Sequence, residues 1–530
     1  MAESLPGKHR GRGPRKRLAL LLGLAVCTSA FAQAPVVVVD GGRLQGAAEA
    51  DVAVFRGIPY AAAPVGELRW RPPLPPLPWS GVRDARRFGN DCPQPPIDGP
   101  PGPGYVNPTS EDCLFLNVWT PRAAASAPLP VMVWIHGGAW IMGAGSWPPY
   151  DGAAFARQGI VLVTINYRLG RFGTFPHPAL RRESERSGEP WADYGLLDQI
   201  AALRWVKRNI AAFGGDPDNV TIFGESAGGR SVNMLLTSPL AAGLFAKAIA
   251  QSGGGQSRLE SVVDTAGSAL PAAEARALAW TRSLGLPDDV DAQTLRRLST
   301  ERVAALDPKA PLPAPVVDGT VLPMQVDAAM IEGRHAKVPY LAGANSAEYS
   351  LLRWLPGAAE ARLQADGEGA DAIVAAYAAG GGDRAGALAR WWGEAGYVGP
   401  ARFYARRMAA SGTPAWLYHF AYVAHDARGR APGAVHGADE GLVFHNEEKP
   451  SRYGDSAHDA PMAALLNAYW AQFARTGDPN RDGLPHWPRL QADGDALLRF
   501  DDAGAHPAAS HARMRLDLLD RLFFEHYRAW

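Results

Sequence analysis

Residues 220–229 constrain the fold of this chain more than any other stretch. The first four have the composition of a β-strand, the next five form the pattern Gly-x-Ser-x-Gly around Ser226, and small residues compatible with a helix follow. This order predicts a tight turn from a strand into a helix, in which glycines allow close packing and the serine hydroxyl is exposed at the edge of a sheet. The five-residue pattern alone is common in surface turns, so its position between a strand and a helix is what supports the specialised turn.

Apolar runs and helical stripes alternate around this stretch. Residues 131–135 form a continuous apolar run, which is too short for a helix and typical of a strand buried on both faces. Residues 194–213 carry apolar side chains at helical spacing, and Gly214 follows as a stop signal. Alternating strands and helices predict an α/β protein with a mostly parallel, doubly wound central sheet and helices on both faces. Further strands are predicted over residues 160–166, 246–251, 338–342 and 415–423.

Two alanine-rich segments lie between the predicted strands. Residues 257–310 and 355–412 have helical composition interrupted by Gly and Pro, and we expect them to be insertions that cap one end of the sheet. A chain of 530 residues with 47% hydrophobic and 20% charged residues has ample material for one large core. We therefore predict a single domain over residues 33–530.

The first 32 residues differ from the rest of the chain. Lys8 to Arg17 form a basic segment, residues 18–26 form an apolar one, and Ala30-Phe31-Ala32 is a small-x-small cleavage pattern. These features predict a secretory signal peptide over residues 1–32, and hence a secreted or periplasmic protein. The apolar segment is too short to span a bilayer and no later stretch reaches about 18 uninterrupted apolar residues, so no stable membrane insertion is expected.

The remainder of the chain is mildly acidic. Residues 1–32 hold six Lys and Arg against one Glu, whereas the following residues hold 47 basic and 52 acidic side chains. Proteins that bind nucleic acid concentrate Lys and Arg on one face or along one helix. The composition therefore argues against a nucleic-acid partner.

Removal of the leader takes Cys27 with it and leaves two cysteines, Cys92 and Cys113. In an oxidising compartment an isolated pair is a candidate disulfide, and closing a loop of this length stabilises the fold by about 3 kcal/mol. Two buried thiols are the alternative. The predicted export favours the disulfide.

A serine needs a base and an orienting carboxylate before it becomes a nucleophile. In the predicted fold the chain order is serine, acid, histidine, with the last two on loops after later strands. Among 13 histidines, His436 follows a late strand and precedes a glycine, whereas His445 and His458 are rivals. A single loop histidine is more often a solvated surface residue. For the acid, Glu348 ends a strand pattern, while Asp318 precedes a glycine in a sequence typical of a turn.

A glycine-rich segment, His136-Gly137-Gly138-Ala139, directly follows the apolar run at residues 131–135. Backbone N–H groups at the end of a strand can converge on one point, and the amide of Ala227 at the start of the next helix can face the same point. Taken alone, the segment could be an ordinary turn that ends a strand. Together with the Ser226 turn, it favours an oxyanion hole.

Several longer motifs make the sequence similar to a known family. Residues 213–228 and 111–121 match, position by position, two specific signatures of the type-B carboxylesterases, the family that includes the cholinesterases. Residues 56–61, residues 196–199, and His436-Gly437 with Asp439 also stand where that family has them. The resemblance runs from about Val36 to the C-terminus.

This resemblance implies an α/β-hydrolase fold with helical and loop insertions over the active site. It implies a Ser226–His436–Glu348 triad, and it makes Cys92–Cys113 the first disulfide of the family. It also implies two further groups of residues: Gly138, Ala139 and Ala227 as oxyanion donors, and Glu225, Ser252 and Asp439 as a supporting network around the triad.

The expected activity is that of a serine carboxylester hydrolase acting on a small ester, as a monomer or homodimer. Where cholinesterases have a choline-binding Trp before an Asn-Pro pair, this chain has Val106, with Tyr105 beside it. A quaternary ammonium prefers a Trp face, so we expect uncharged short-to-medium acyl or aryl esters as substrates. The alternatives are a non-catalytic binding homologue of the same fold, or a lactone, amide or polyester hydrolase with the same triad.

Residues 478–483 imitate the opening of a calcium-binding loop. The twelfth position of such a loop requires a bidentate Glu, and here it is Arg489. We expect a polar turn at this place, and we expect neither a metal ion nor an organic cofactor.

Overall fold

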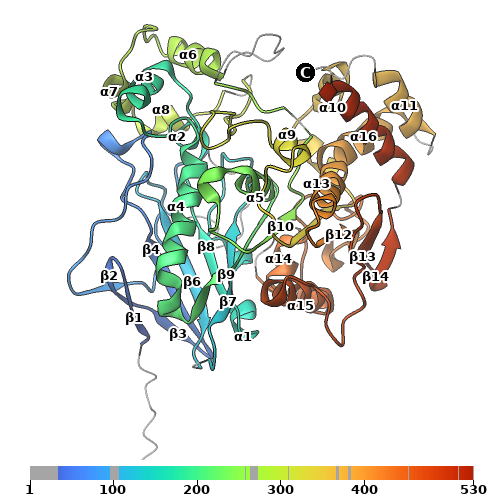
Figure 1. Cartoon of the computed structure of the whole chain (residues 1–530), viewed down its shortest axis with the longest axis horizontal. Coiled ribbons are helices and arrows are strands. Elements are labelled where there is room, and N and C mark those ends of the chain that lie inside the picture. Colours follow the sequence, from blue (N-terminus) through green and yellow to red (C-terminus); the bar gives the residue numbers. More distant parts are fainter. Residues whose placement is uncertain are drawn as a thin grey trace, which may run out of the picture. The chain divides into compact units, whose positions relative to one another are not determined.

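A sheet of eleven strands runs through the molecule, in the spatial order β14-β13-β12-β11-β10-β9-β7-β8-β6-β4-β3 (Figure 1). The strands from β8 to β13 in this order are parallel, and antiparallel strands lie at both edges. This arrangement confirms the predicted α/β fold. The strands are β3 (Ala47–Glu49), β4 (Val52–Pro59), β6 (Phe115–Pro121), β7 (Leu129–Ile135), β8 (Val161–Ile165), β9 (Gly215–Glu225), β10 (Lys247–Gln251), β11 (Tyr340–Asn345), β12 (Ala415–Phe420), β13 (Ala496–Asp501) and β14 (Gly504–Ala509).

The computed structural model describes residues 34–528 except 96–106, 124, 257, 263–272, 308–309, 366–368, 380–382, 450, 452 and 511. The predicted leader, residues 1–32, and the pair Tyr105 and Val106 therefore lie outside the described residues. The described residues from Ala34 onward belong to one compact unit. Near its start, β1 (Val36–Val39), β2 (Gly42–Gln45) and β5 (Val82–Asp84) form a second, small sheet.

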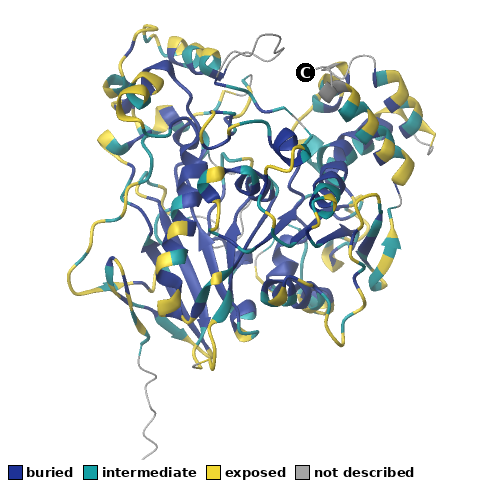
Figure 2. Cartoon of the chain, viewed as in Figure 1, coloured by how far each residue is buried: buried dark blue, intermediate teal, exposed yellow. Residues whose placement is uncertain are grey.

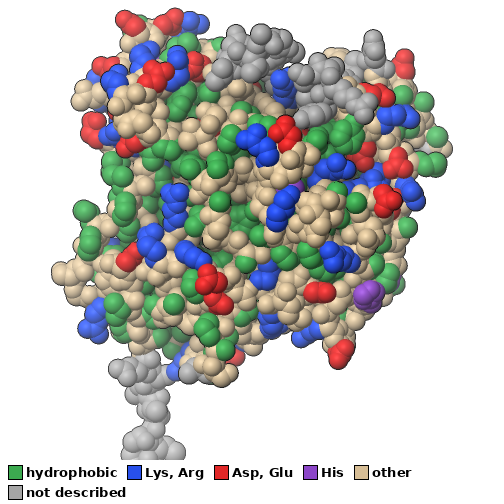
Figure 3. All heavy atoms as spheres, viewed as in Figure 1, with side chains coloured by type: hydrophobic (Ala, Val, Ile, Leu, Met, Phe, Trp, Pro, Cys, Tyr) green, Lys and Arg blue, Asp and Glu red, His purple; other side chains and the backbone are tan. Residues whose placement is uncertain are grey.

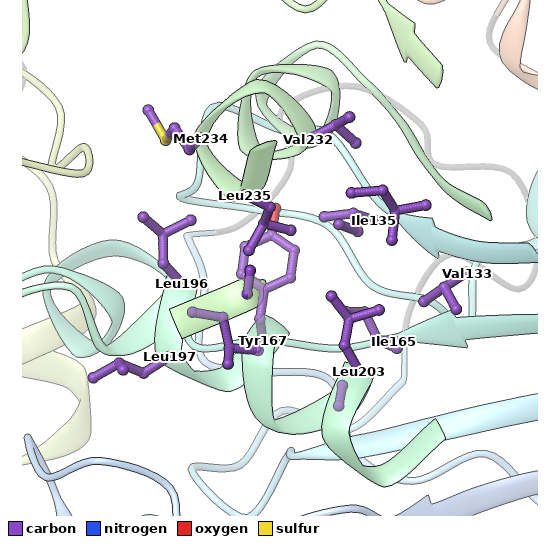
Figure 4. Packing of buried hydrophobic residues seen from close by; sticks show 14 of the residues in the cluster. Val133, Ile135, Ile165, Tyr167, Leu196, Leu197, Leu203, Val232, Met234 and Leu235 are labelled. Carbon is purple, nitrogen blue, oxygen red and sulfur yellow. The ribbon is translucent and has the colours of Figure 1, made fainter. Parts of the chain in front are cut away.

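Side chains of the central strands alternate between two hydrophobic layers, as a period of two requires. In β7, Val133 and Ile135 pack with Leu203 of α4 (Tyr194–Asn209) and Leu235 of α5 (Ala227–Thr237), as Figure 4 shows, whereas Trp134 belongs to the layer on the other face. That second layer includes residues of α1 (Ala153–Arg157), α14 (Glu440–Val443) and α15 (Ala460–Thr476). The strands are consequently dark blue in Figure 2, buried between helices on both sides.

The helices that cover the sheet end at recognisable signals. The predicted helix over residues 194–213 is α4 (Tyr194–Asn209) followed by a tighter 3-10 turn, Ile210–Phe213, and Gly214 ends it with φ of 81°. Such a left-handed C-terminal residue favours glycine. The other helices outside the two predicted insertions are α1 (Ala153–Arg157), α2 (Gly170–Gly173), α3 (Pro178–Ser187), α5 (Ala227–Thr237), α9 (Val326–Ile331), α14 (Glu440–Val443), α15 (Ala460–Thr476) and α16 (Arg513–Arg528).

The two predicted insertions are helical. Figure 1 shows α6 (Ala273–Ser283) and α7 (Ala292–Arg296) from the first insertion, and α10 (Ala358–Ala365) and α11 (Ala370–Ala378) from the second, beyond the upper ends of the strands. The first insertion also contains α8 (Thr300–Ala304), and the second contains α12 (Arg384–Gly393) and α13 (Gly399–Ala410). Because α13 contacts β11 and β12, part of the second insertion covers a face of the sheet rather than its end.

Basic and acidic side chains are interspersed over the face of the molecule that Figure 3 shows. Among the described residues, none of the helices combines the length and the apolar character that crossing a bilayer requires.

Candidate active site

Ser226 occupies the turn between β9 and α5, with backbone angles φ of 56° and ψ of −121°. This conformation is unusual for a residue with a side chain and is stored strain of the kind found at functional turns. The flanking glycines are required sterically: a Cβ on Gly228 would lie 1.9 Å from the carbonyl oxygen of Ile135, and one on Gly224 would lie 2.6 Å from the same atom. The predicted strand–turn–helix is present.

Ser226, His436 and Glu348 are in mutual contact. Oγ of Ser226 lies 2.8 Å from Nε2 of His436, and Nδ1 of the same ring hydrogen-bonds Oε2 of Glu348. The other oxygen of Glu348 accepts hydrogen bonds from Oγ of Ser252 at 2.6 Å and from the backbone N–H of Asn345 at 2.7 Å. The side chains of His436 and Glu348 are 8% and 1% exposed, so water competes little for these contacts.

Two loops that follow adjacent parallel strands hold the histidine and the acid. Glu348 follows β11 and His436 follows β12, and the loops are joined where the N–H of Ala347 donates to the carbonyl of Ala434 at 2.9 Å. The backbone N–H of His436 also donates to Oγ of Ser350, at 3.1 Å. The carboxyl ends of neighbouring strands thus bring together residues that lie far apart in the sequence.

The rival residues lie elsewhere. His445 pairs with Glu447 at 3.6 Å, and the exposed ring of His458 stacks on that of His425 with centroids 4.1 Å apart. Asp318 accepts hydrogen bonds from backbone N–H groups two and four residues further along the chain, as in the expected turn.

The glycine-rich segment after β7 is held in unusual backbone conformations. Gly138 has φ of 98° and Ala139 has φ of 54°. A Cβ on Gly138 would lie 2.2 Å from the carbonyl oxygen of Met142, and one on Gly143 would lie 2.3 Å from Nδ1 of His136. Burial lowers the pKa of His136 to about 4, so this ring stays neutral and supports the loop without a charge.

A glutamine that sequence reasoning missed holds the far end of this loop. Nε2 of Gln94 donates to the carbonyl of Gly143 at 3.2 Å, and the N–H of Gly143 donates to Oε1 of Gln94 at 2.9 Å. Gln94 lies two residues after Cys92, and the predicted Cys92–Cys113 disulfide is present. The disulfide-closed segment therefore supports the loop that carries Gly138 and Ala139.

Replacing both Cys92 and Cys113 with serine should lower the free energy of unfolding by about 3 kcal/mol, because the unfolded chain regains the freedom of the closed loop. Urea denaturation of the oxidised parent and of the double variant measures this difference. Mass spectrometry of the non-reduced parent, showing the two cysteines linked, is the necessary control. An unchanged midpoint would contradict the prediction.

The three residues expected to support the triad approach it from different sides. Ser252 contacts Glu348 directly, and Asp439 accepts a hydrogen bond from Nδ2 of Asn345 at 3.1 Å, next to the same carboxylate. Oε1 of Glu225 lies 3.3 Å from Nε2 of His436. Burial, and then the charges of Glu440 and Asp439, raise the pKa of Glu225 well above its usual range.

Tyr397 is a second residue that the sequence did not reveal. Its ring centroid is 4.8 Å from that of His436. The residue lies on a single π-helical turn, Glu394–Val398, between α12 and α13. Such turns occur frequently at functional sites because the extra residue redirects side chains. Periodicity in the sequence carries no clear signal for them, since the flanking segments are ordinary helix.

A mostly parallel sheet with a strained serine turn after one strand, and with histidine and carboxylate on loops after later strands, defines an α/β-hydrolase. Comparisons agree. The model of the Carboxylesterase family matches residues 33–517. The chain is 37% identical to the fumonisin B1 esterase of Sphingopyxis macrogoltabida over 485 residues, 88% of this chain and 86% of that protein. It is 34% identical to the para-nitrobenzyl esterase of Bacillus subtilis, over 88% and 94% of the two chains.

The crystal structure of a Geobacillus stearothermophilus carboxylesterase is also similar, with a TM-score of 0.77, 34% identity, and coverage of 91% of this chain and 99% of that one. The chain belongs to the carboxylesterase family. It is a carboxylic ester hydrolase.

Proposed function

We propose that Ser226 is the nucleophile of this hydrolase, His436 its general base and acid, and Glu348 the group that orients the imidazole. The observation that carries the proposal is the 2.8 Å contact between Oγ of Ser226 and Nε2 of His436, with Nδ1 of the ring bound to Glu348. Nucleophile and base within hydrogen-bond reach, with the base oriented by a third group, is the arrangement that serine catalysis needs.

In the proposed reaction, Oγ of Ser226 attacks the ester carbonyl while Nε2 of His436 takes the hydroxyl proton. The tetrahedral oxyanion is stabilised by the backbone N–H groups of Gly138, Ala139 and Ala227. His436 then returns the proton to the leaving alcohol, and an acyl-enzyme remains on Ser226. A water molecule, deprotonated by the same nitrogen, releases the acid and regenerates the serine.

Glu225, Ser252 and Asp439 are assigned supporting roles. Ser252 and the amide of Asn345 keep Glu348 in place with two hydrogen bonds, and Asp439 orients Asn345. Glu225 lies beside His436, and its raised pKa favours the uncharged carboxyl over a second buried anion next to the triad.

Active-site titration tests the assignment. An alkylphosphonate with a p-nitrophenyl leaving group should release about one equivalent of p-nitrophenolate per chain, because a serine activated by histidine displaces it and remains phosphonylated. Peptide mass spectrometry should then locate the added mass on Ser226. Stoichiometric labelling of a different residue, or full ester hydrolysis by the labelled protein, would contradict the proposal.

We propose uncharged short-to-medium acyl or aryl esters as the substrate class. A cation–π site contributes about 0.5–2 kcal/mol, a factor of roughly 2 to 30 in binding, and Val106 stands where cholinesterases place the Trp of that site. 3,3-Dimethylbutyl butyrate should therefore be hydrolysed with a kcat/KM at least equal to that of its charged isostere, butyrylcholine. A clear preference for butyrylcholine that disappears in Tyr105→Ala would show that Tyr105 replaces the missing Trp.

The Cys92–Cys113 disulfide also supports an extracellular or periplasmic location, since such bonds persist in oxidising compartments. The proposal is that residues 1–32 are a signal peptide cleaved after Ala32, and that the mature enzyme is a monomer or homodimer.

A further inference from the structure

The π-helical turn Glu394–Val398 and the glycine before it contact both the acid and the base of the proposed triad. Tyr397, near the end of the turn, places its ring centroid 4.8 Å from that of His436, at an interplanar angle of 56°. Just before the turn, a Cβ on Gly393 would lie 3.3 Å from Cβ of Glu348, so the backbone there packs directly against the acid. The extra residue of a π-helical turn thus brings one segment against two members of the triad.

The Tyr397 ring restrains His436 in a way that the hydrogen bonds of the triad do not. The bonds at Nδ1 and Nε2 hold the imidazole along the line that joins its two nitrogens, but they resist tilting about that line only weakly. An aromatic ring packed against the imidazole opposes this tilt. Among the described residues, Tyr397 has the only ring in contact with that of His436, so the restraint depends on one side chain.

Tyr397 is itself held by its surroundings. Its ring centroid is 5.9 Å from that of Trp392, which is buried. A Cβ on Gly254 would lie 3.8 Å from Cε1 of Tyr397, so backbone lies beside the edge of the ring. The hydroxyl makes no hydrogen bond to the described residues. Tyr397 therefore acts on its neighbours through the ring.

The C-terminal helix α16 anchors the turn. Nη2 and Nε of Arg515 donate to the two carboxylate oxygens of Glu394 at 2.6 and 3.0 Å, and the hydroxyl of Tyr377 in α11 donates to the second oxygen at 2.8 Å. The Glu394 side chain is 12% exposed, so water competes little for these bonds. A guanidinium that binds a carboxylate through two bonds fixes both position and orientation. The helix is thereby connected to His436 through Glu394 and Tyr397.

We propose that Tyr397 is a positioning residue, whose ring keeps the imidazole of His436 aligned with Ser226. Arg515 acts on the same imidazole from a distance, through Glu394 and the turn that carries Tyr397. The inference rests on the proposed roles of Ser226 and His436 and adds a group that acts through the imidazole. Its expected effect is large, because a displacement of about 1 Å in a reacting group can cost on the order of 100-fold in rate.

Two substitutions of Tyr397 test the role of the ring. Tyr397→Leu should lower kcat for p-nitrophenyl butyrate about 10- to 100-fold and leave KM within about threefold, because acylation and deacylation both use His436. Tyr397→Phe keeps the ring and should retain kcat within about twofold. The rate of phosphonylation of Ser226 should fall in parallel with kcat, since that reaction also needs an aligned base. The final extent of labelling counts the correctly folded sites.

The anchor is tested from the other end of the connection. Arg515→Met should lower kcat about three- to tenfold, and Arg515→Lys should recover part of the loss, since the charge remains without the planar fork. The matched control is Arg521→Met, which removes an exposed arginine of the same helix and should change kcat less than about twofold. If Arg515 acts through Tyr397, the double variant Tyr397→Leu/Arg515→Met should be no slower than Tyr397→Leu alone.

Three results would overturn the inference. The first is a fully labelled Tyr397→Leu protein that keeps more than about half of the parent's kcat. The second is a loss that appears in KM and differs between p-nitrophenyl acetate and p-nitrophenyl hexanoate, which would make Tyr397 a wall of the acyl pocket instead. The third is an additive loss in the double variant, which would show that Arg515 does not act through Tyr397.

The test does not depend on the folding of Tyr397→Leu. If that variant is unfolded, an Arg515→Met protein with the kcat of the parent and of Arg521→Met still overturns the inference. The two proposals also fail separately. A fully active Tyr397→Leu protein that is phosphonylated on Ser226 leaves the triad intact and refutes only the role of Tyr397, whereas a folded and fully active His436→Ala protein refutes both.

Discussion

A Ser226→Ala protein should fold like the parent and lose roughly four to six orders of magnitude in kcat for p-nitrophenyl butyrate. The fold should survive because alanine retains the Cβ and the same backbone preferences, so the strain at φ of 56° is unchanged and only Oγ is removed. The activity should be lost because, among the described residues, no other hydroxyl contacts Nε2 of His436.

The matched control is Ser252→Ala, which removes one hydrogen bond to Glu348 and leaves the nucleophile in place. We expect a loss of about 10- to 100-fold for this variant. Thermal unfolding of both proteins establishes that they are folded. If folded Ser226→Ala kept more than about one percent of the parent's turnover, the covalent mechanism would be wrong.

His436→Ala should reduce kcat by a comparable factor, since Ser226 would then lack a proton acceptor. Removing the ring also deprives the carboxylate of Glu348, which is 1% exposed, of one of its hydrogen-bond partners, so a modest loss of stability should accompany the loss of activity. Steady-state kinetics and urea denaturation measure the two effects separately.

His445→Ala and His458→Ala are the controls for this assignment. The two residues contact Glu447 and His425 rather than Ser226, and both variants should hydrolyse p-nitrophenyl butyrate within about threefold of the parent. Abolished activity in either one, with His436→Ala still active, would show that the base had been assigned to the wrong histidine.

Much of this molecule follows from local patterns. The apolar run that forms β7, the helical stripe of α4 and the glycines around Ser226 each reflect a rule that acts within a few residues: side-chain period, helix termination, or the space a Cβ needs. The last of these is visible in the 1.9 Å approach that a Cβ on Gly228 would make to the carbonyl of Ile135. The carboxyl ends of the parallel strands then meet at one edge of the sheet, because helices join the strands.

The resemblance to the family identified the histidine and the acid of the triad, which local patterns could not single out. Spacing left His436 with two rivals and Glu348 with one, because an isolated loop residue carries no periodicity. The structure places His436 and Glu348 together through a backbone link between Ala347 and Ala434, residues that are 87 positions apart.

The sequence by itself determined the sheet, the serine turn and the family. The sheet and the turn follow from patterns that repeat or act over two to four residues, and the family follows from continuous signatures. Only the tertiary structure decided that Gln94 holds Gly143, that a π-helical turn places Tyr397 on His436, and that Arg515 anchors this turn from α16. These contacts join segments separated by tens to hundreds of residues. They depend on how whole helices and loops pack, and this packing produces no periodic pattern in the sequence.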